Sequence, residues 1–99
     1  MYYIYILRCN NDSLYTGITI DLQRRIKEHF GRSKKCAKYT FSNQVKKLEI
    51  AWQAENRAMA CKLEYHLKQL SKKDKEDIIQ TEKLELLNSK IECNRYKML

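Results

Sequence analysis

The chain has 99 residues, enough for one modest hydrophobic core but too few to divide into two. The apolar run at residues 1–7 is too short to span a membrane, ends at Arg8, and lacks the basic leader and cleavage site of a signal peptide. We therefore expect one soluble, cytoplasmic domain without a membrane partner. The four cysteines form no CxxC or CxxH pair, which favours reduced, mostly buried thiols over a zinc site.

The net charge of +8 is concentrated in one quarter of the sequence. Nine Lys and Arg residues and a single acid, Glu28, lie between Arg24 and Lys47, while the rest of the chain has eleven residues of each sign. Localised positive charge with interleaved aromatic residues is typical of a polyanion partner and favours a nucleic acid, although a solvated basic face is the simpler alternative. The candidate nucleic-acid contacts are Arg24, Lys27, Arg32, Lys34, Lys35, Lys38 and Tyr39.

The first third of the chain predicts a hairpin followed by a helix. Residues 1–7 suit a strand buried on both faces, residues 10–13 form a turn, and residues 14–19 return as a second strand. Gly17 interrupts that strand, which indicates either a bulge or a close approach by another backbone or a ligand.

A helix is expected after Asp21 or Thr19, either of which can cap it. Leu22, Ile26 and Phe30 recur at helical spacing as its buried stripe, and Gly31 is the natural stop. Arg25 and His29 are four residues apart and share a neighbouring stripe.

The rest of the chain predicts a basic loop, a strand and two helical segments. Residues 32–44 read as a loop, or as a loop with one helical turn. Residues 47–53 alternate like a strand, with Leu48, Ile50 and Trp52 on one face. A helix capped by Asn56 then extends to residue 70, with Glu64 at the margin of its apolar stripe.

The C-terminal segment begins with a capping box, in which Ser71 is followed three residues later by Asp74. The order of elements is therefore ββαβαα in one compact α/β domain. We expect a core over residues 1–72 and a helical tail over residues 73–99.

Two tripeptides and three single residues recur in an order typical of one nuclease family. Tyr3-Ile4-Tyr5 and Tyr15-Thr16-Gly17 lie on the two hairpin strands, and Arg25 follows eight residues after Gly17. His29 and the mid-helix Glu64 complete the set, so the chain resembles the small stand-alone members of the GIY-YIG nuclease superfamily. The resemblance implies a three-stranded antiparallel sheet flanked by helices. It also implies divalent-metal-dependent hydrolysis of DNA phosphodiesters, in the setting of DNA repair or recombination.

The chemistry of the matched residues agrees with that implied activity. The forked guanidinium of Arg25 suits the charge that develops on a phosphodiester in its transition state. Glu64 alone suffices as a protein ligand for Mg²⁺ or Mn²⁺, since Mg²⁺ keeps several waters and is completed by substrate oxygens. Tyr15, and secondarily Tyr5, would position or deprotonate the attacking water, with His29 as proton carrier or phosphate ligand.

Departures from the family pattern support two rival hypotheses. Tyr3 and Thr16 replace a glycine and an isoleucine, and Ile18 stands where some repair nucleases of the superfamily have a lysine. The sequence contains no zinc finger or helix-turn-helix, so targeting would be weak or supplied by a protein partner. The chain is then a catalytically weak DNA-binding module, or a subunit that uses its apolar tail to join a larger nucleic-acid-processing complex.

Overall fold

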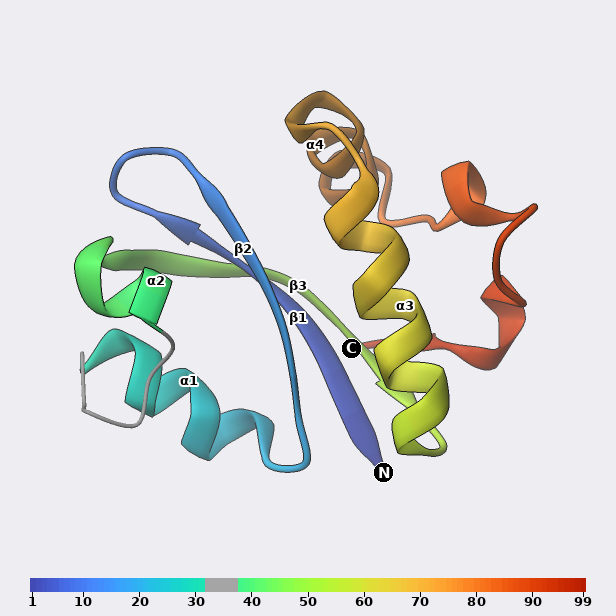
Figure 1. The fold of residues 1–99 in the computed structure, drawn as a ribbon, viewed down its shortest axis with the longest axis horizontal. Coiled ribbons are helices and arrows are strands. Elements are labelled where there is room, and N and C mark those ends of the chain that lie inside the picture. Colours follow the sequence, from blue (N-terminus) through green and yellow to red (C-terminus); the bar gives the residue numbers. More distant parts are fainter. Residues whose placement is uncertain (32–37) are drawn as a thin grey trace.

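An antiparallel sheet organises the protein (Figure 1). The computed structural model describes residues 1–31 and 38–99, and in this part of the chain the sheet has four strands in the order β2-β1-β3-β4. The prediction of three strands was therefore wrong. The additional strand, β4, has only two residues and so leaves no alternating pattern in the sequence. The strands are β1 (Tyr2–Cys9), β2 (Leu14–Thr19), β3 (Val45–Ala54) and β4 (Lys97–Met98).

The longer helices begin at side-chain caps that the sequence predicted. Asp21, Asn56 and Ser71 each accept a hydrogen bond from the backbone N–H three residues later, which satisfies a donor that the first helical turn leaves unpaired. The expected order ββαβαα did not include α2 or the two 3₁₀ turns of the tail. Residues 32–44 were expected to form a loop or a loop with one helical turn, and α2 shows that the second alternative is correct. The helices are α1 (Leu22–Phe30), α2 (Lys38–Ser42), α3 (Arg57–Gln69) and α4 (Lys72–Thr81), and the 3₁₀ turns are η1 (Glu85–Leu87) and η2 (Cys93–Arg95).

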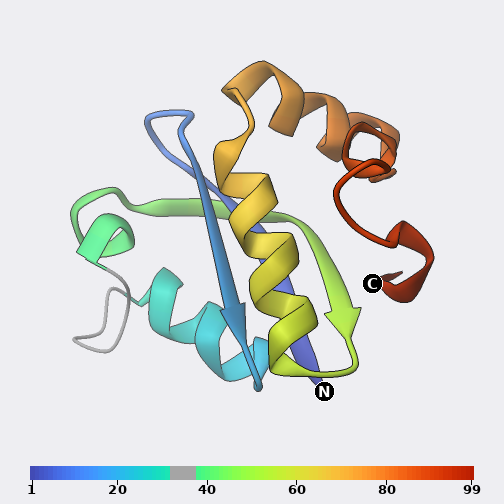
Figure 2. The ribbon, with the colours of Figure 1, turned by 45° about the vertical axis from the view of Figure 1, so that its right-hand side comes forward.

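The two faces of the sheet are covered by different helices (Figures 1 and 2). Ile4, Ile6 and Trp52 point to one face, where they pack with α3 and the tail. Tyr5 and Leu7 point to the other face, toward α1. The central strand β1 is thus buried on both faces, as its almost unbroken apolar sequence predicted.

A register shift in the β1–β3 pairing changes the direction of one predicted core residue. Ile6 pairs with Ile50 whereas Leu7 pairs with Leu48, so Glu49 is an extra residue in β3. The expectation that Leu48 shares a face with Ile50 was wrong, because Leu48 lies beside α1 and is 38% exposed. The bulge also brings the Glu49 carboxylate to the guanidinium of Arg8.

Arg8 is the centre of an ion-pair network that ties the tail to the sheet. Its half-buried side chain contacts Glu49 on β3, Asp12 in the hairpin turn and Glu76 on α4. Lys72 adds a second contact between α4 and the turn, 2.9 Å from Asp12. The network therefore joins elements that are up to 68 positions apart in the sequence.

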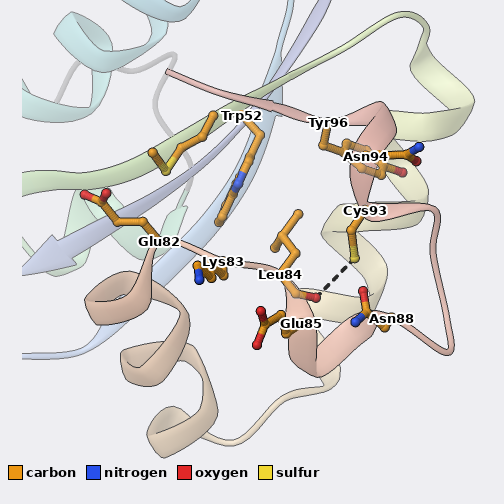
Figure 3. Close-up of a pocket in the computed structure, with 10 residues that line it drawn as sticks. Trp52, Glu82, Lys83, Leu84, Glu85, Asn88, Cys93, Asn94 and Tyr96 are labelled. Carbon is orange, nitrogen blue, oxygen red and sulfur yellow. Dashed lines mark hydrogen bonds between the residues drawn. The ribbon is translucent and has the colours of Figure 1, made fainter.

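Most apolar residues of the tail are buried within the domain. Ile78, Leu84, Leu87 and Ile91 belong to the cluster that includes Trp52, whereas Leu86 is 51% exposed, so most of the apolar surface that motivated the subunit hypothesis is covered. A pocket of about 290 Å³ remains between Trp52 and the tail (Figure 3), and Cys93 beside it donates its thiol proton to the Leu84 carbonyl. Of the helices formed by the described residues, none combines the length and apolar character that crossing a membrane requires.

Candidate active site

Gly17 makes room for the side chain of Tyr5. The two residues face each other in the β1–β2 ladder, whose register is continuous. A Cβ atom at Gly17 would lie 2.4 Å from the Tyr5 hydroxyl oxygen and 2.6 Å from Cζ. Neither glycine of the chain, both of which the structure describes, has a positive φ. Gly17 thus marks no bulge in this ladder. It marks the close approach of a side chain, which brings the Tyr5 hydroxyl to α1.

The Tyr5 hydroxyl meets a fully buried histidine at the end of α1. The oxygen lies 2.8 Å from His29 Nε2, and His29 Nδ1 lies 2.6 Å from Thr40 Oγ1 on α2. Phe30, which the periodicity placed in the buried stripe, is 40% exposed instead. A buried imidazole is tolerated here because both of its nitrogens have hydrogen-bond partners.

Burial changes the protonation behaviour expected of His29. It lowers the pKa of the imidazole to about 4, with a further lowering contribution from the positive charge of Arg25. The sequence suggested a group that titrates near neutrality, but in the folded protein His29 is neutral at physiological pH. A neutral imidazole has one nitrogen that donates and one that accepts a hydrogen bond.

Arg25 lies one helical turn before His29 and connects the same phenol to an acidic partner. Its guanidinium is 3.0 Å from the Glu28 carboxylate, in a pair that is mostly buried. Arg25 also donates a hydrogen bond toward the Tyr5 hydroxyl. The helix therefore presents a positive charge and a neutral imidazole side by side, as the four-residue spacing predicted.

Tyr5 keeps its proton in this environment. Burial raises the pKa of Tyr5 to about 12, and the opposing effect of the Arg25 hydrogen bond is smaller. The negative charge of Glu64 contributes to the same rise, which means that Glu64 on α3 is near enough to act on a phenol held by α1. The structure thus brings Tyr5, Arg25, His29 and Glu64 into one neighbourhood.

Two further tyrosines extend the cluster toward the surface. The ring of Tyr15 is centred 6.5 Å from Tyr5 and 5.5 Å from His29. On its other side Tyr15 stacks on Tyr39 of α2, with the centroids 5.9 Å apart and the planes inclined by 18°. Tyr39 is 39% exposed, so the aromatic group leads from the buried histidine to solvent.

Glu64 is the carboxylate available for a metal ion. Its side chain is 22% exposed and lies 3.3 Å from the Lys68 ammonium, one turn along α3. Among the described residues, no group of three His, Cys, Asp or Glu side chains could hold a metal ion. A single carboxylate can serve as the protein ligand of an Mg²⁺ ion only where water and substrate oxygens fill the remaining positions.

The predicted DNA-binding residues fall into two groups. Arg24, Lys27, Lys38 and Tyr39 are exposed on α1 and α2, near the cluster, whereas the remaining three lie outside the described residues. Sequence reasoning missed Thr40 and Glu28. The three-residue spacing from Arg25 could have indicated Glu28, but nothing in the local sequence marks Thr40. The three residues outside the described part are Arg32, Lys34 and Lys35.

Comparisons with known proteins identify the family of the chain. The family described as the GIY-YIG catalytic domain matches residues 1–77. The UPF0213 protein FN1575 of Fusobacterium nucleatum is 46% identical over 78 residues, which are 79% of this chain and 76% of that protein. The UPF0213 protein BH0048 of Halalkalibacterium halodurans is 41% identical over 78 residues, covering 79% of this chain and 81% of the relative.

A solved structure is similar over most of the chain. The solution NMR structure of the UPF0213 protein BH0048 from Bacillus halodurans superposes with a TM-score of 0.51 at 35% sequence identity. The superposition covers 82% of this chain and 85% of that one.

Proposed function

The chain belongs to the GIY-YIG family of catalytic domains, and from this premise we propose that it is a divalent-metal-dependent endonuclease that hydrolyses DNA phosphodiesters. The observation that carries the proposal is the convergence on the Tyr5 hydroxyl. His29 Nε2 is 2.8 Å away, Arg25 donates toward the same oxygen, and the charge of Glu64 acts on it. A guanidinium, a carboxylate and a neutral imidazole in one neighbourhood suit phosphodiester hydrolysis.

Arg25 would bind the phosphodiester and stabilise its transition state. Negative charge increases on the phosphoryl oxygens as water attacks, and a guanidinium can donate two parallel hydrogen bonds to them. The Glu28 contact of 3.0 Å and the Tyr5 contact hold the guanidinium in place before substrate arrives. This preorganisation reduces the rearrangement needed in the transition state.

Tyr15 is the better candidate of the two tyrosines for orienting the attacking water. Tyr5 is 1% exposed and retains its proton until the pH reaches about 12. Tyr15 is only partly buried and lies on the outer side of His29. We therefore assign Tyr5 to holding Arg25 and His29, and the neutral His29 to accepting a proton during turnover.

Glu64 would hold a single Mg²⁺ or Mn²⁺ ion. The charge of this half-buried carboxylate contributes to the raised pKa of Tyr5. Its Lys68 partner is half exposed, so a metal ion could displace the ammonium from the carboxylate. When bound, the ion supplies Lewis-acid stabilisation of the leaving oxygen.

Arg24, Lys27 and Lys38 would follow the DNA backbone on either side of the cut phosphate, and Arg32, Lys34 and Lys35, which lie outside the described residues, stay predicted phosphate contacts. Because these side chains would contact phosphates and not base edges, binding is expected to be weakly sequence-specific and strongly weakened by salt. Tyr39 offers an exposed ring on which a base can stack.

The test is cleavage of supercoiled plasmid, single-stranded DNA and a flap or four-way junction in Mg²⁺, Mn²⁺ or EDTA. Glu64→Ala is expected to reduce cleavage to background while leaving binding intact. Lys68→Ala is its matched control, because it removes the same ion pair but keeps the carboxylate.

Arg25→Ala is expected to lower kcat roughly 100- to 1000-fold with a smaller change in affinity. The exposed neighbour Arg24 gives the control Arg24→Ala, for which weaker binding and near-normal kcat are expected. Cleavage that persists in both Glu64→Ala and Arg25→Ala would refute the site. A wild-type protein that binds DNA in low salt but cuts none in any metal is instead a DNA-binding module.

A further inference from the structure

The hydrogen bonds of His29 leave two arrangements of its proton, because both of its partners are hydroxyl groups. Tyr5 contacts Nε2 at 2.8 Å and Thr40 contacts Nδ1 at 2.6 Å. A hydroxyl can donate or accept, so neutral His29 can carry its proton on either nitrogen. The rest of the cluster determines which arrangement is satisfied.

Arg25 removes this symmetry. A guanidinium has only donors, so its hydrogen bond toward Tyr5 uses the phenolic oxygen as an acceptor. The Tyr5 proton then needs an acceptor of its own, and Tyr5 is 1% exposed. Within the described residues, His29 Nε2 is the hydrogen-bond partner that the structure gives to this hydroxyl.

We propose that Thr40 is a positioning residue: Arg25 and Tyr5 direct a donor to Nε2, and Thr40 supplies the acceptor that the resulting Nδ1-protonated tautomer of His29 requires. The donors then run in one direction, from Arg25 to the Tyr5 oxygen, from the Tyr5 hydroxyl to His29 Nε2, and from His29 Nδ1 to Thr40 Oγ1. Thr40 is fully buried, so no water replaces its oxygen as the acceptor for Nδ1. The lone pair of Nε2 consequently faces the active-site phenol.

The tautomer is a property of the folded protein, whereas its effect on turnover rests on the proposed endonuclease function. With Nε2 unprotonated, His29 can accept a proton from the site. The opposite tautomer would direct an N–H toward Tyr5 and leave no proton acceptor there. Thr40 thus acts on the reaction only through His29.

The test compares Thr40→Val with Thr40→Ser. Valine keeps the size of the threonine but removes the acceptor for Nδ1–H, while serine keeps the hydroxyl. Two-dimensional ¹H–¹⁵N spectra of the imidazole are expected to show Nδ1–H in the wild type and in Thr40→Ser, and a shift toward Nε2–H in Thr40→Val. Turnover of Thr40→Val is expected to fall at least about tenfold in kcat with little change in KM, since general acid–base catalysis is what is lost.

Thr16→Val is the matched control. Thr16 is another buried threonine, it pairs with Ile6 and so shares the α3 face of the sheet, and its Oγ1 has no hydrogen-bond partner in the described structure. This variant is expected to leave the His29 spectrum and kcat unchanged.

A wild-type imidazole protonated at Nε2 would overturn the proposal, and this spectrum decides the tautomer even if Thr40→Val does not fold. Retention of Nδ1–H and full turnover in Thr40→Val would overturn it as well. If the wild type cuts no DNA, the endonuclease proposal fails, but the spectra still confirm or refute the role of Thr40 in fixing the tautomer.

Discussion

The close contact between Tyr5 and Gly17 predicts that Gly17→Ala is strongly destabilising. Ordinary van der Waals contact begins at 3.4 Å, whereas the new Cβ would lie 2.4 Å from the Tyr5 oxygen and 2.6 Å from Cζ. The Tyr5 ring must therefore move by about 1 Å within a close-packed core. That movement also pulls its hydroxyl away from His29.

The magnitude follows from three contributions. Overpacking of a core costs about 1–3 kcal/mol, and the lost Tyr5–His29 hydrogen bond adds roughly 1 kcal/mol. Alanine also restricts the backbone of the unfolded chain, which offsets roughly 0.4–1 kcal/mol of this loss in stability. The free energy of unfolding is expected to fall by roughly 1–3.5 kcal/mol, and Tm by roughly 5–25 °C.

Urea unfolding followed by tryptophan fluorescence measures this change. Trp52 is the only tryptophan in the chain and is 2% exposed on the opposite face of the sheet, so it reports unfolding without contacting the mutated site. Gly31→Ala is the matched control, because Gly31 has a φ of −79° and, among the described residues, its Cβ would meet the Lys27 carbonyl at 3.1 Å. That variant is expected to change stability by less than about 1 kcal/mol.

A double-mutant cycle tests the assigned cause. In the Tyr5→Leu background the aromatic ring is absent, so Gly17→Ala should cost less than about 0.5 kcal/mol. If Gly17→Ala costs the same in both backgrounds, the reasoning from the Tyr5 ring is refuted. A wild-type-like Tm for Gly17→Ala would refute it directly.

Two further predictions concern charge. His29 has its pKa lowered from 6.5 to about 4 in the folded state, so the neutral form stabilises the fold above pH 6.5 and this stabilisation is lost as the pH falls toward 4. Urea titrations between pH 6.5 and 4 are expected to show a decrease of about 3 kcal/mol in the free energy of unfolding from this group. A His29 resonance that titrates near pH 6.5 by NMR would contradict the prediction. Arg8→Met leaves the half-buried carboxylates of Glu49 and Glu76 without their guanidinium partner, and is expected to lower the free energy of unfolding by about 2–4 kcal/mol. A loss below about 1 kcal/mol in urea would show that the network contributes little.

Local signals in the sequence predicted the helix starts well, because capping is a property of a few adjacent residues. Asp21, Asn56 and Ser71 accept hydrogen bonds from backbone groups three positions away, so no distant contact is needed to recognise them. The strand Leu14–Thr19 was likewise bounded by its turn residues. The sequence did not decide whether Gly17 in this strand marks a bulge or a close contact, since nothing near it in the sequence indicates that Tyr5 covers it.

The failures occurred where a distant partner overrides the local pattern. Apolar spacing placed Phe30 in the core of α1, but His29 is buried in its place because Tyr5 and Thr40 satisfy its two nitrogens. Leu48 turns away from Trp52 because an extra residue shifts the β1–β3 register. Neither the hydrogen bonds nor the register can be inferred from hydrophobic periodicity alone.

The position of the cluster also shows how residues of the hairpin and a distant glutamate come near one another in this chain. Tyr5 belongs to the face of the sheet that α1 covers, whereas Glu64 belongs to a helix on the other face. The α3 helix packs against β2, an edge strand in the described sheet, and the Tyr5 ring lies over Gly17 of that strand. A side chain at position 17 would therefore disturb more than the core, since it would displace the phenol that contacts His29 on α1. Stability and the proposed chemistry depend on the same small residue for the same geometric reason.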